Sequence, residues 1–175
     1  ENDIEESITA LENTQKIINS KNLTKTNTSL LLSQQIPDIP LIYYPHGLQA
    51  AAIRFKSSLQ ENAKSHAITE DVIESCHNGI VAWEKSSPLQ PILIQGYDDY
   101  FKTKERWKIL KIFFDKNGIK YHDVYSINGN ILSKLINLIY RLDYTTIYRA
   151  ISCKIDPSTI NSIVFVKRHL NSNLE

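Results

Sequence analysis

Short apolar runs alternate with amphipathic stretches from residue 37 to the end of the chain. The runs predict three strands, "IPLIYY", "PILIQG" and "IKYHDVYSI". The stretches that follow them predict three helices, "LQAAAIRFKSSLQENAK", "KERWKILKIFFDKNG" and "NILSKLINLIYRLDYTTIYRAISC". Largely apolar strands separated by helices indicate a mostly parallel sheet that is covered on both faces. We therefore expect an α/β protein with three α-β-α layers, in which weak extra strands or a neighbouring domain complete the short sheet.

Local signals mark the ends of several helices. Apolar positions recur every four residues from Ala51 to Ala63, which gives the first helix one apolar stripe. Gly118 is the expected glycine just beyond the second helix. After a break at Asp156-Pro157, "STINSIVFVKRHL" predicts a terminal helix with Ser158 as its N-cap.

Residues 1–36 carry two weaker helical patterns. The apolar residues of "DIEESITALENTQKIIN" recur at near-helical spacing, namely Ile4, Ile8, Leu11 and Ile18. Asp3 is the expected N-cap of that helix, and "LLLSQQI" predicts a second, shorter one. Little in this segment can form a core alone. We therefore expect residues 1–36 to be a helical interdomain connector or strap that packs on a neighbouring domain, and residues 37–175 to form one domain.

Charge and hydropathy exclude two classes of partner. Twenty basic and nineteen acidic residues leave a net charge of +1, without the basic excess that nucleic-acid binding normally needs. No apolar run approaches the roughly 18 residues of a membrane span. We therefore expect neither nucleic acid nor membrane as a partner.

The cysteines and histidines indicate the redox compartment of the protein and whether it binds a metal ion. Cys76 and Cys153 are the only cysteines, so neither a disulfide framework nor a cysteine-rich zinc site is expected, and a reducing cytoplasm fits best. None of the five histidines is paired at the i,i+3 or i,i+4 spacing of helical metal ligands, so no metal site is expected. The chain has no methionine and begins with Glu1, from which we expect a piece of a longer protein.

Ligands of such sheets bind beyond the carboxyl ends of the strands, so the loops after "LIYY" and "ILIQG" border the expected site. Pro45-His46-Gly47, at a strand-to-helix turn, could bring a ligand oxygen to the helix N-terminus. A simple tight turn is the alternative. The loop with His77 could fold across the same edge. No Walker loop, GxGxxG, HExxH or nucleophile elbow is present.

Three polar residues have side chains suited to acid–base chemistry. Glu61 lies near the end of its helix, where the helix dipole disfavours a negative charge, and this suits a base that must take up a proton. His77 precedes an apolar Val-Ala-Trp run, where a half-buried imidazole can act as acid, base or capping donor. Lys167 is placed at the end of the last helix, where a cation also complements the dipole without any catalytic role. Taken singly, each is as well explained as a structural or surface residue.

Three stretches together resemble the C-terminal sugar-isomerase (SIS) domain of bifunctional phosphoglucose/phosphomannose isomerases. "IPLIYYPHGLQAAAIRFKSSLQENAK" is similar to that family's strand, loop and helix ending in Glu-Asn-Ala-Lys. "CHNGIVAWE" is similar to its His-Asn-Glu-Ile-Val-Gly-Trp, and "LIYRLDYTTIYRAISCKIDPSTINSIVFVKRHL" to its closing Asp-Tyr helix, Asp-Pro break and Leu-Lys-Arg ending. The first 36 residues resemble the family's interdomain connector. The resemblance implies a flavodoxin-like SIS fold.

The resemblance also implies a reaction and roles for named residues. Glu61 would be the base that moves a proton between C2 and C1 of the sugar, through a cis-enediol. His77 would assist ring opening, reaching the site from a second subunit of a homodimer, and Lys167 would serve the same step. Arg54, His46 and Gly47 are the expected substrate-binding residues. The substrate would be glucose or mannose 6-phosphate interconverting with fructose 6-phosphate, without metal or organic cofactor.

The sequence departs from the family pattern in three respects. Gly79 replaces the glutamate after the His-Asn pair, and Ala82 replaces a glycine before Trp83. The family's first SIS domain, with its Gly-x-Ser-Gly-x-Thr-type phosphate loop, has no counterpart in these 175 residues. We therefore expect the phosphate to be held outside this chain, and this piece alone to be weak or inactive.

Two other hypotheses stay open. One is a non-catalytic SIS-like module that binds a phosphosugar or mediates dimerisation, which the loss of the glutamate at Gly79 favours. The other is a degenerate isomerase that keeps only the fold, which would be supported if Glu61 and His77 pointed away from every cleft, even in the dimer.

Overall fold

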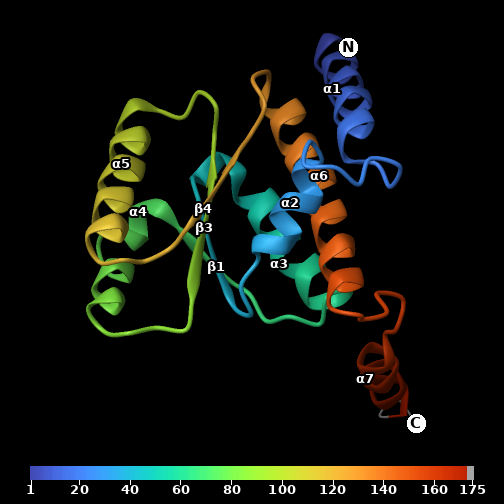
Figure 1. Cartoon of the computed structure of the whole chain (residues 1–175). Helices are drawn as coiled ribbons and strands as arrows, with labels where there is room; N and C mark the ends of the chain where they lie inside the picture. The colour runs from blue at the N-terminus through green and yellow to red at the C-terminus, as the bar shows by residue number, and fades with distance from the viewer. Residues whose placement is uncertain (173–175) are drawn as a thin grey trace.

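The structure, a computed structural model, describes residues 1–172 and contains a four-stranded parallel sheet (Figure 1). The strands are β1 (Pro40–Tyr44), β2 (Ile68–Asp71), β3 (Gln90–Gln95) and β4 (His122–Tyr125), in the order β2-β1-β3-β4. The three strands predicted from the sequence are confirmed. β2 is one of the weak extra strands that the sequence left open, and within residues 1–172 it lies at one edge of the sheet and pairs with β1 only.

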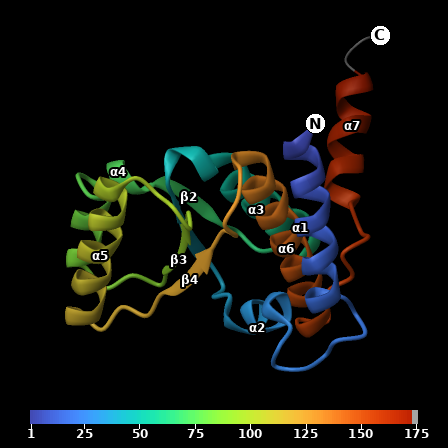
Figure 2. The same ribbon diagram turned by 90° about the horizontal axis from the view of Figure 1, so that it is seen from above.

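Helices cover both faces of the sheet, as predicted. α3 (Gln49–Asn62) and α6 (Ile131–Ser152) lie on one face, and the short α4 (Val72–Ser75) and α5 (Phe101–Lys116) lie on the other (Figure 2). The three-layer α-β-α fold is therefore confirmed. Two short 3-10 helices, η1 (His46–Leu48) and η2 (Gly79–Glu84), follow β1 and α4.

The core has two halves because successive strand residues point to opposite faces of the sheet. Ile42, Ile92 and Ile94 are fully buried against α3 and α6. Tyr43 and Leu93 are fully buried on the other face, against α5. A strand buried on both faces has no polar face, which explains the continuous apolar runs of β1 and β3.

The predicted helix signals hold for α3 and α5 but not for the last helix. The apolar stripe from Ala51 to Ala63 is buried, and Gly118 has the left-handed φ of +67° that favours glycine beyond a helix end. α7 (Asn161–Ser172) begins three residues after Ser158, so the prediction of Ser158 as its N-cap is wrong. The backbone N–H and hydroxyl of Ser158 instead donate to Asp156 Oδ1, at 2.9 and 2.7 Å, and close a turn before α7.

Residues 1–36 form the two predicted helices, α1 (Asn2–Ile18) and α2 (Thr28–Gln35), both packed along α6. The N-cap position of α1 is Glu1, so the prediction of Asp3 as N-cap is wrong. Asn27 caps α2 by accepting a 2.9 Å hydrogen bond from the N–H of Leu30. The boundary between residues 36 and 37 stays a prediction, since α2 contributes to the core through Leu32.

The face of α1 that packs against the rest of the protein is not the apolar face predicted from the sequence. Its buried residues are Ser7, Thr14 and Ile18, whereas Ile4 and Ile8 are 57% and 51% exposed. Ser7 shares a 3.0 Å hydrogen bond with Ser133 of α6, and Asn137 of α6 donates a 2.6 Å bond to Thr14. The polar side of α1 therefore packs on α6 because it forms hydrogen bonds there. The spacing of apolar residues along α1 cannot predict such bonds.

None of the helices in residues 1–172 combines the length and the apolarity that crossing a membrane requires.

Candidate active site

Glu61 lines a cleft of about 490 Å³ at the end of α3. The cleft lies between the last two turns of α3 and the segment that enters α7, with walls formed by Ser57, Gln60, Glu61, Lys64 and residues 159–163. Its mouth is open and Glu61 is exposed. Among residues 1–172, the Glu61 carboxylate has no ion-pair or hydrogen-bond partner, so it is available to a ligand.

Arg54, two turns earlier on α3, is bound to α6. Its guanidinium donates to Asp143, with Nη2 lying 2.9 Å from Oδ2 and Nε 3.2 Å from Oδ1. Ser58 donates a 2.6 Å hydrogen bond to the same carboxylate. Arg54 is thus engaged by Asp143, which is the aspartate of the Asp-Tyr motif, and its role in substrate binding stays a prediction.

His46 and Gly47 lie in η1, at the other end of α3. They stand beside the carboxyl ends of β1 and β3, where ligands bind in sheets of this topology. The length of α3 places them about 20 Å from Glu61, from a rise of about 1.5 Å per residue. One ligand of hexose size therefore cannot contact Glu61 and this turn in the same chain.

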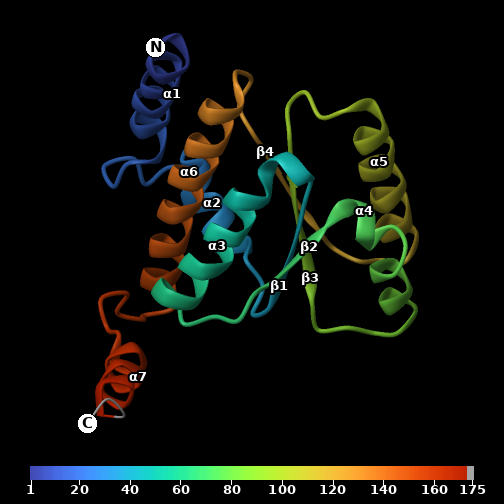
Figure 3. The same cartoon turned by 180° about the vertical axis from the view of Figure 1, so that it is seen from behind.

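His77 lies on the opposite face of the sheet from Glu61. Its segment follows α4 and packs through Cys76 and Trp83 on the core half that contains α5, whereas α3 lies in the other half (Figure 3). The sheet stands between the two residues. His77 is exposed, so the prediction of a half-buried imidazole is wrong. The neighbouring apolar residues Ile80 and Trp83 turn inward, whereas the imidazole projects from a turn.

A carboxylate fills the space beside Gly79, the position at which the family pattern has glutamate. A Cβ added at Gly79 would lie 2.3 Å from Oε1 of Glu70, which projects from β2. Burial raises the pKa of the Glu70 carboxyl, and the nearby charge of Glu74 adds to this shift. The turn that carries His77 therefore has a carboxylate next to it, supplied by a different position of the chain.

Glu70→Gln should increase stability at high pH more than at low pH. The pKa of Glu70 is raised in the folded state, so its ionisation opposes folding as the pH rises above the ordinary range of a glutamate. Thermal unfolding of Glu70→Gln and the parent protein between pH 4 and pH 8 should show a difference in Tm that grows with pH. Glu84→Gln, at an exposed position, is the control and should show a smaller pH-dependent difference. Equal behaviour of the two variants would contradict the burial of Glu70.

Lys167 lies on α7, the helix that begins at the wall of the Glu61 cleft. α7 continues for five residues beyond it, so Lys167 is in the middle of the helix and not at its end as predicted. Residues 161–170 are all exposed, and Lys167 does not line the cleft.

Sequence reasoning missed a polar group at the carboxyl edge of the sheet. Lys134 of α6 is buried and forms an ion pair with Asp98, in the loop after β3. The neighbouring Asp99 accepts hydrogen bonds of 2.9 Å from the N–H of Gly96 and 3.0 Å from the indole of Trp107. Burial raises the pKa of Asp99, while these bonds oppose the shift. The Lys134–Asp98 pair spans 36 residues, so no local pattern could have indicated it.

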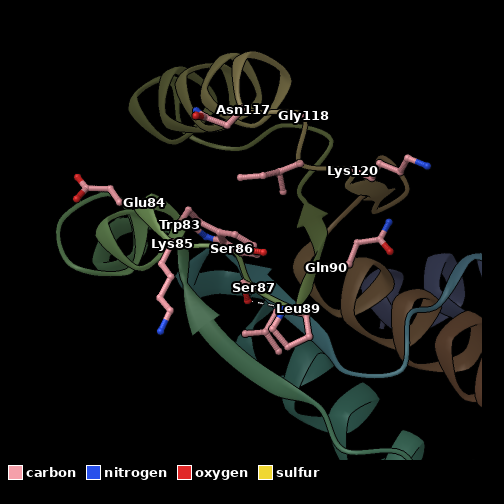
Figure 4. Close-up of a pocket in the computed structure, with 12 residues that line it drawn as sticks. Trp83, Glu84, Lys85, Ser86, Ser87, Leu89, Gln90, Asn117, Gly118 and Lys120 are labelled. Carbon is pink, nitrogen blue, oxygen red and sulfur yellow. Dashed lines mark hydrogen bonds between the residues drawn. The ribbon is translucent and has the colours of Figure 1, made fainter.

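The depression in Figure 4 lies at the opposite, amino-terminal edge of the sheet, before β3 and β4. It has a volume of about 470 Å³ and is lined by residues 83–90 and 117–120. None of the predicted site residues lines it, so we do not assign the site to it. Within residues 1–172, no three His, Cys, Asp or Glu side chains are grouped closely enough to hold a metal ion.

Comparison with known proteins gives one family and one fold. The family model described as the bacterial phospho-glucose isomerase C-terminal SIS domain matches residues 25–170. The bifunctional phosphoglucose/phosphomannose isomerase of Caldicellulosiruptor bescii is 29% identical over 155 residues, which are 86% of this chain and 44% of that protein. The enzyme of the same name from Aquifex aeolicus is 23% identical and covers 77% of this chain and 43% of its own length. The chain thus spans less than half the length of these curated relatives.

The solved structures agree on the fold. A glucose-6-phosphate isomerase-like protein from Thermus thermophilus superposes with a TM-score of 0.73 at 19% identity, over 89% of this chain and 54% of that one. At this identity the likeness supports the SIS fold alone.

Proposed function

Since the chain belongs to the family of bacterial phospho-glucose isomerase C-terminal SIS domains, we propose that it is part of an isomerase of glucose and/or mannose 6-phosphate. The product of both substrates is fructose 6-phosphate, formed through a cis-enediol. Glu61 is the base of this reaction, and His77 and Lys167 assist opening of the sugar ring. The reaction uses no metal or organic cofactor and takes place in the cytoplasm.

The position of Glu61 carries this proposal. Among the residues that the structure describes, its carboxylate has no ion-pair or hydrogen-bond partner, and it lies at the wall of a cleft that also borders the lysine-bearing helix α7. Aldose–ketose exchange needs a carboxylate that can take a proton from one carbon and return it to the next. It also needs groups that donate to the ring and carbonyl oxygens as charge develops there. The phosphate is held by a second SIS domain of the full-length protein.

The opposite placement of Glu61 and His77 supports a site shared by two chains. A homodimer would pair Glu61 of one protomer with the imidazole of its partner, so each dimer would contain two equivalent sites. The exposure of His77 fits this role, because the imidazole is free to enter another subunit.

Mixing two full-length variants tests the shared site. Glu61→Gln and His77→Gln should each keep only a small fraction of wild-type activity alone. After unfolding and refolding together, they should recover about a quarter of wild-type activity, because half of the dimers are mixed and each mixed dimer has one intact site. Activity that stays at the level of the separate variants would show that one chain supplies both residues.

A non-catalytic module that binds phosphosugar or mediates dimerisation is the alternative, and the glycine at position 79 favours it. A coupled assay of the full-length protein with both hexose 6-phosphates separates the two functions. We expect turnover of at least one substrate. A raised Tm with either sugar phosphate and no turnover would instead indicate the binding module.

A further inference from the structure

Lys64 is one of two non-glycine residues with a left-handed backbone in residues 1–172, and the other is Lys154. Lys64 follows the end of α3 with a φ of +54°, and Lys154 follows the end of α6 with a φ of +57°. Glycine is the usual residue at such positions, because a side chain there is strained. A strained residue persists where its surroundings hold it, and such residues cluster at functional sites.

The side chain of Lys64 distinguishes it from Lys154. Its ammonium donates a 2.6 Å hydrogen bond to the carbonyl oxygen of Glu61, in the last turn of α3. It donates a second bond of the same length to the carbonyl oxygen of Thr159, 95 residues later in the chain. One cation thus joins the end of α3 to the segment that leads into α7.

The segment after α6 is largely exposed in the part of the chain that the structure describes. We call residues 156–172 the C-terminal arm. All its residues from 158 to 170 are exposed, and Asp156, Ser158 and Thr159 hydrogen-bond among themselves. In Figure 3 the arm extends away from the layers of the fold beyond the ends of α3 and α6. The bond from Lys64 to Thr159 lies at the base of the arm, where it would set the direction of α7.

We infer that Lys64 is a positioning residue that clamps the C-terminal arm to the end of α3 and so forms the cleft of Glu61. Both walls of the cleft meet at this ammonium, since Ser57, Gln60 and Glu61 come from α3 and residues 159–163 from the arm. The effect on catalysis rests on the proposed function, whereas the clamp itself can be tested without any activity.

The two strained lysines provide a matched pair of variants. Lys64→Gly and Lys154→Gly both place the favoured residue at a left-handed position, so both should fold. Lys64→Gly alone removes the ammonium that bonds Thr159. Lys64→Arg keeps a cation and should preserve the clamp in part.

Hydrogen–deuterium exchange of the full-length protein, followed by mass spectrometry, reports on the arm directly. Peptides covering residues 156–170 should exchange at least about tenfold faster in Lys64→Gly than in the parent protein, because this variant loses a charge-assisted hydrogen bond, which is among the stronger kinds. In Lys154→Gly the same peptides should exchange at the parent rate. Equal rates in the two glycine variants would overturn the clamp.

Kinetics of the same variants test the consequence for the site. Lys64→Gly should lower kcat by roughly tenfold to a hundredfold, the order expected of a misplaced catalytic group. KM should change little, because the ammonium of Lys64 is already engaged by two carbonyl oxygens of the protein. Lys64→Arg should recover part of kcat, and Lys154→Gly should behave as the parent. The full-length parent protein could lack isomerase activity while the arm still exchanges faster in Lys64→Gly. This result would contradict the proposed function but support the clamp. Faster exchange with unchanged kcat would show that the clamp does not serve catalysis.

Discussion

Glu61→Gln in the full-length protein should lower kcat for hexose 6-phosphate isomerisation by about 10² to 10⁴, the usual contribution of a general base. Glutamine keeps the size and hydrogen-bonding capacity of the side chain but cannot accept the proton from the sugar carbon. KM should stay within a few-fold of the parent value, since we propose that the phosphate is held by the second SIS domain. A coupled assay in both directions of the reaction measures both constants.

The control for this variant is Glu105→Gln, which alters an exposed glutamate paired with Lys102 on α5. It should leave kcat and KM unchanged. If Glu61→Gln behaves like this control, Glu61 is not the base, and the cleft at the end of α3 is not the catalytic site.

Phe114→Ala should have the largest effect on stability, lowering the free energy of unfolding by about 3 to 5 kcal/mol, the range for a buried Phe reduced to Ala. Phe114 belongs to α5, and its fully buried ring lies 5.6 Å from that of Trp83 and 5.8 Å from that of Tyr121, centroid to centroid. Trp83 ends the segment that carries His77 and donates a 3.0 Å hydrogen bond to the Tyr43 hydroxyl. Denaturant unfolding measures the loss.

Phe113→Ala makes the same chemical change one residue earlier, at a partly buried position. It should cost clearly less than Phe114→Ala. Equal losses would contradict the deeper burial of Phe114 in this half of the core.

The fold could be predicted because most of its signals are local. β1 and β3 are buried on both faces and α3 on one, so their apolar periods could be read directly. β2 gave no such signal, since it is an edge strand whose four residues include Glu70 and Asp71. The face that α1 buries depends on serine and threonine partners in α6, 126 positions away for Ser7.

The sequence allowed candidate site residues to be proposed one by one, but it did not predict their arrangement in space. Glu61 and His77 were proposed from motif resemblance. The 16 positions that separate them contain β2, after which the chain continues on the other face of the sheet, and the spacing alone does not show this. Lys64 could be recognised in the sequence as the last residue of the Glu-Asn-Ala-Lys motif. Its bond to Thr159 could not be predicted, because it depends on the path of the chain after α6.

Proton transfer itself tests the central claim most directly. Fructose 6-phosphate incubated with the full-length protein in D₂O should yield aldose 6-phosphate that carries deuterium at C2, observed by proton NMR. This is expected because a carboxylate that receives the proton can exchange it with solvent before returning it. The Glu61→Gln protein should form product and exchange protons at least about a hundredfold more slowly. No deuterium in either sugar phosphate after many turnovers, or exchange that continues at the parent rate in Glu61→Gln, would contradict a cis-enediol reaction with Glu61 as its base.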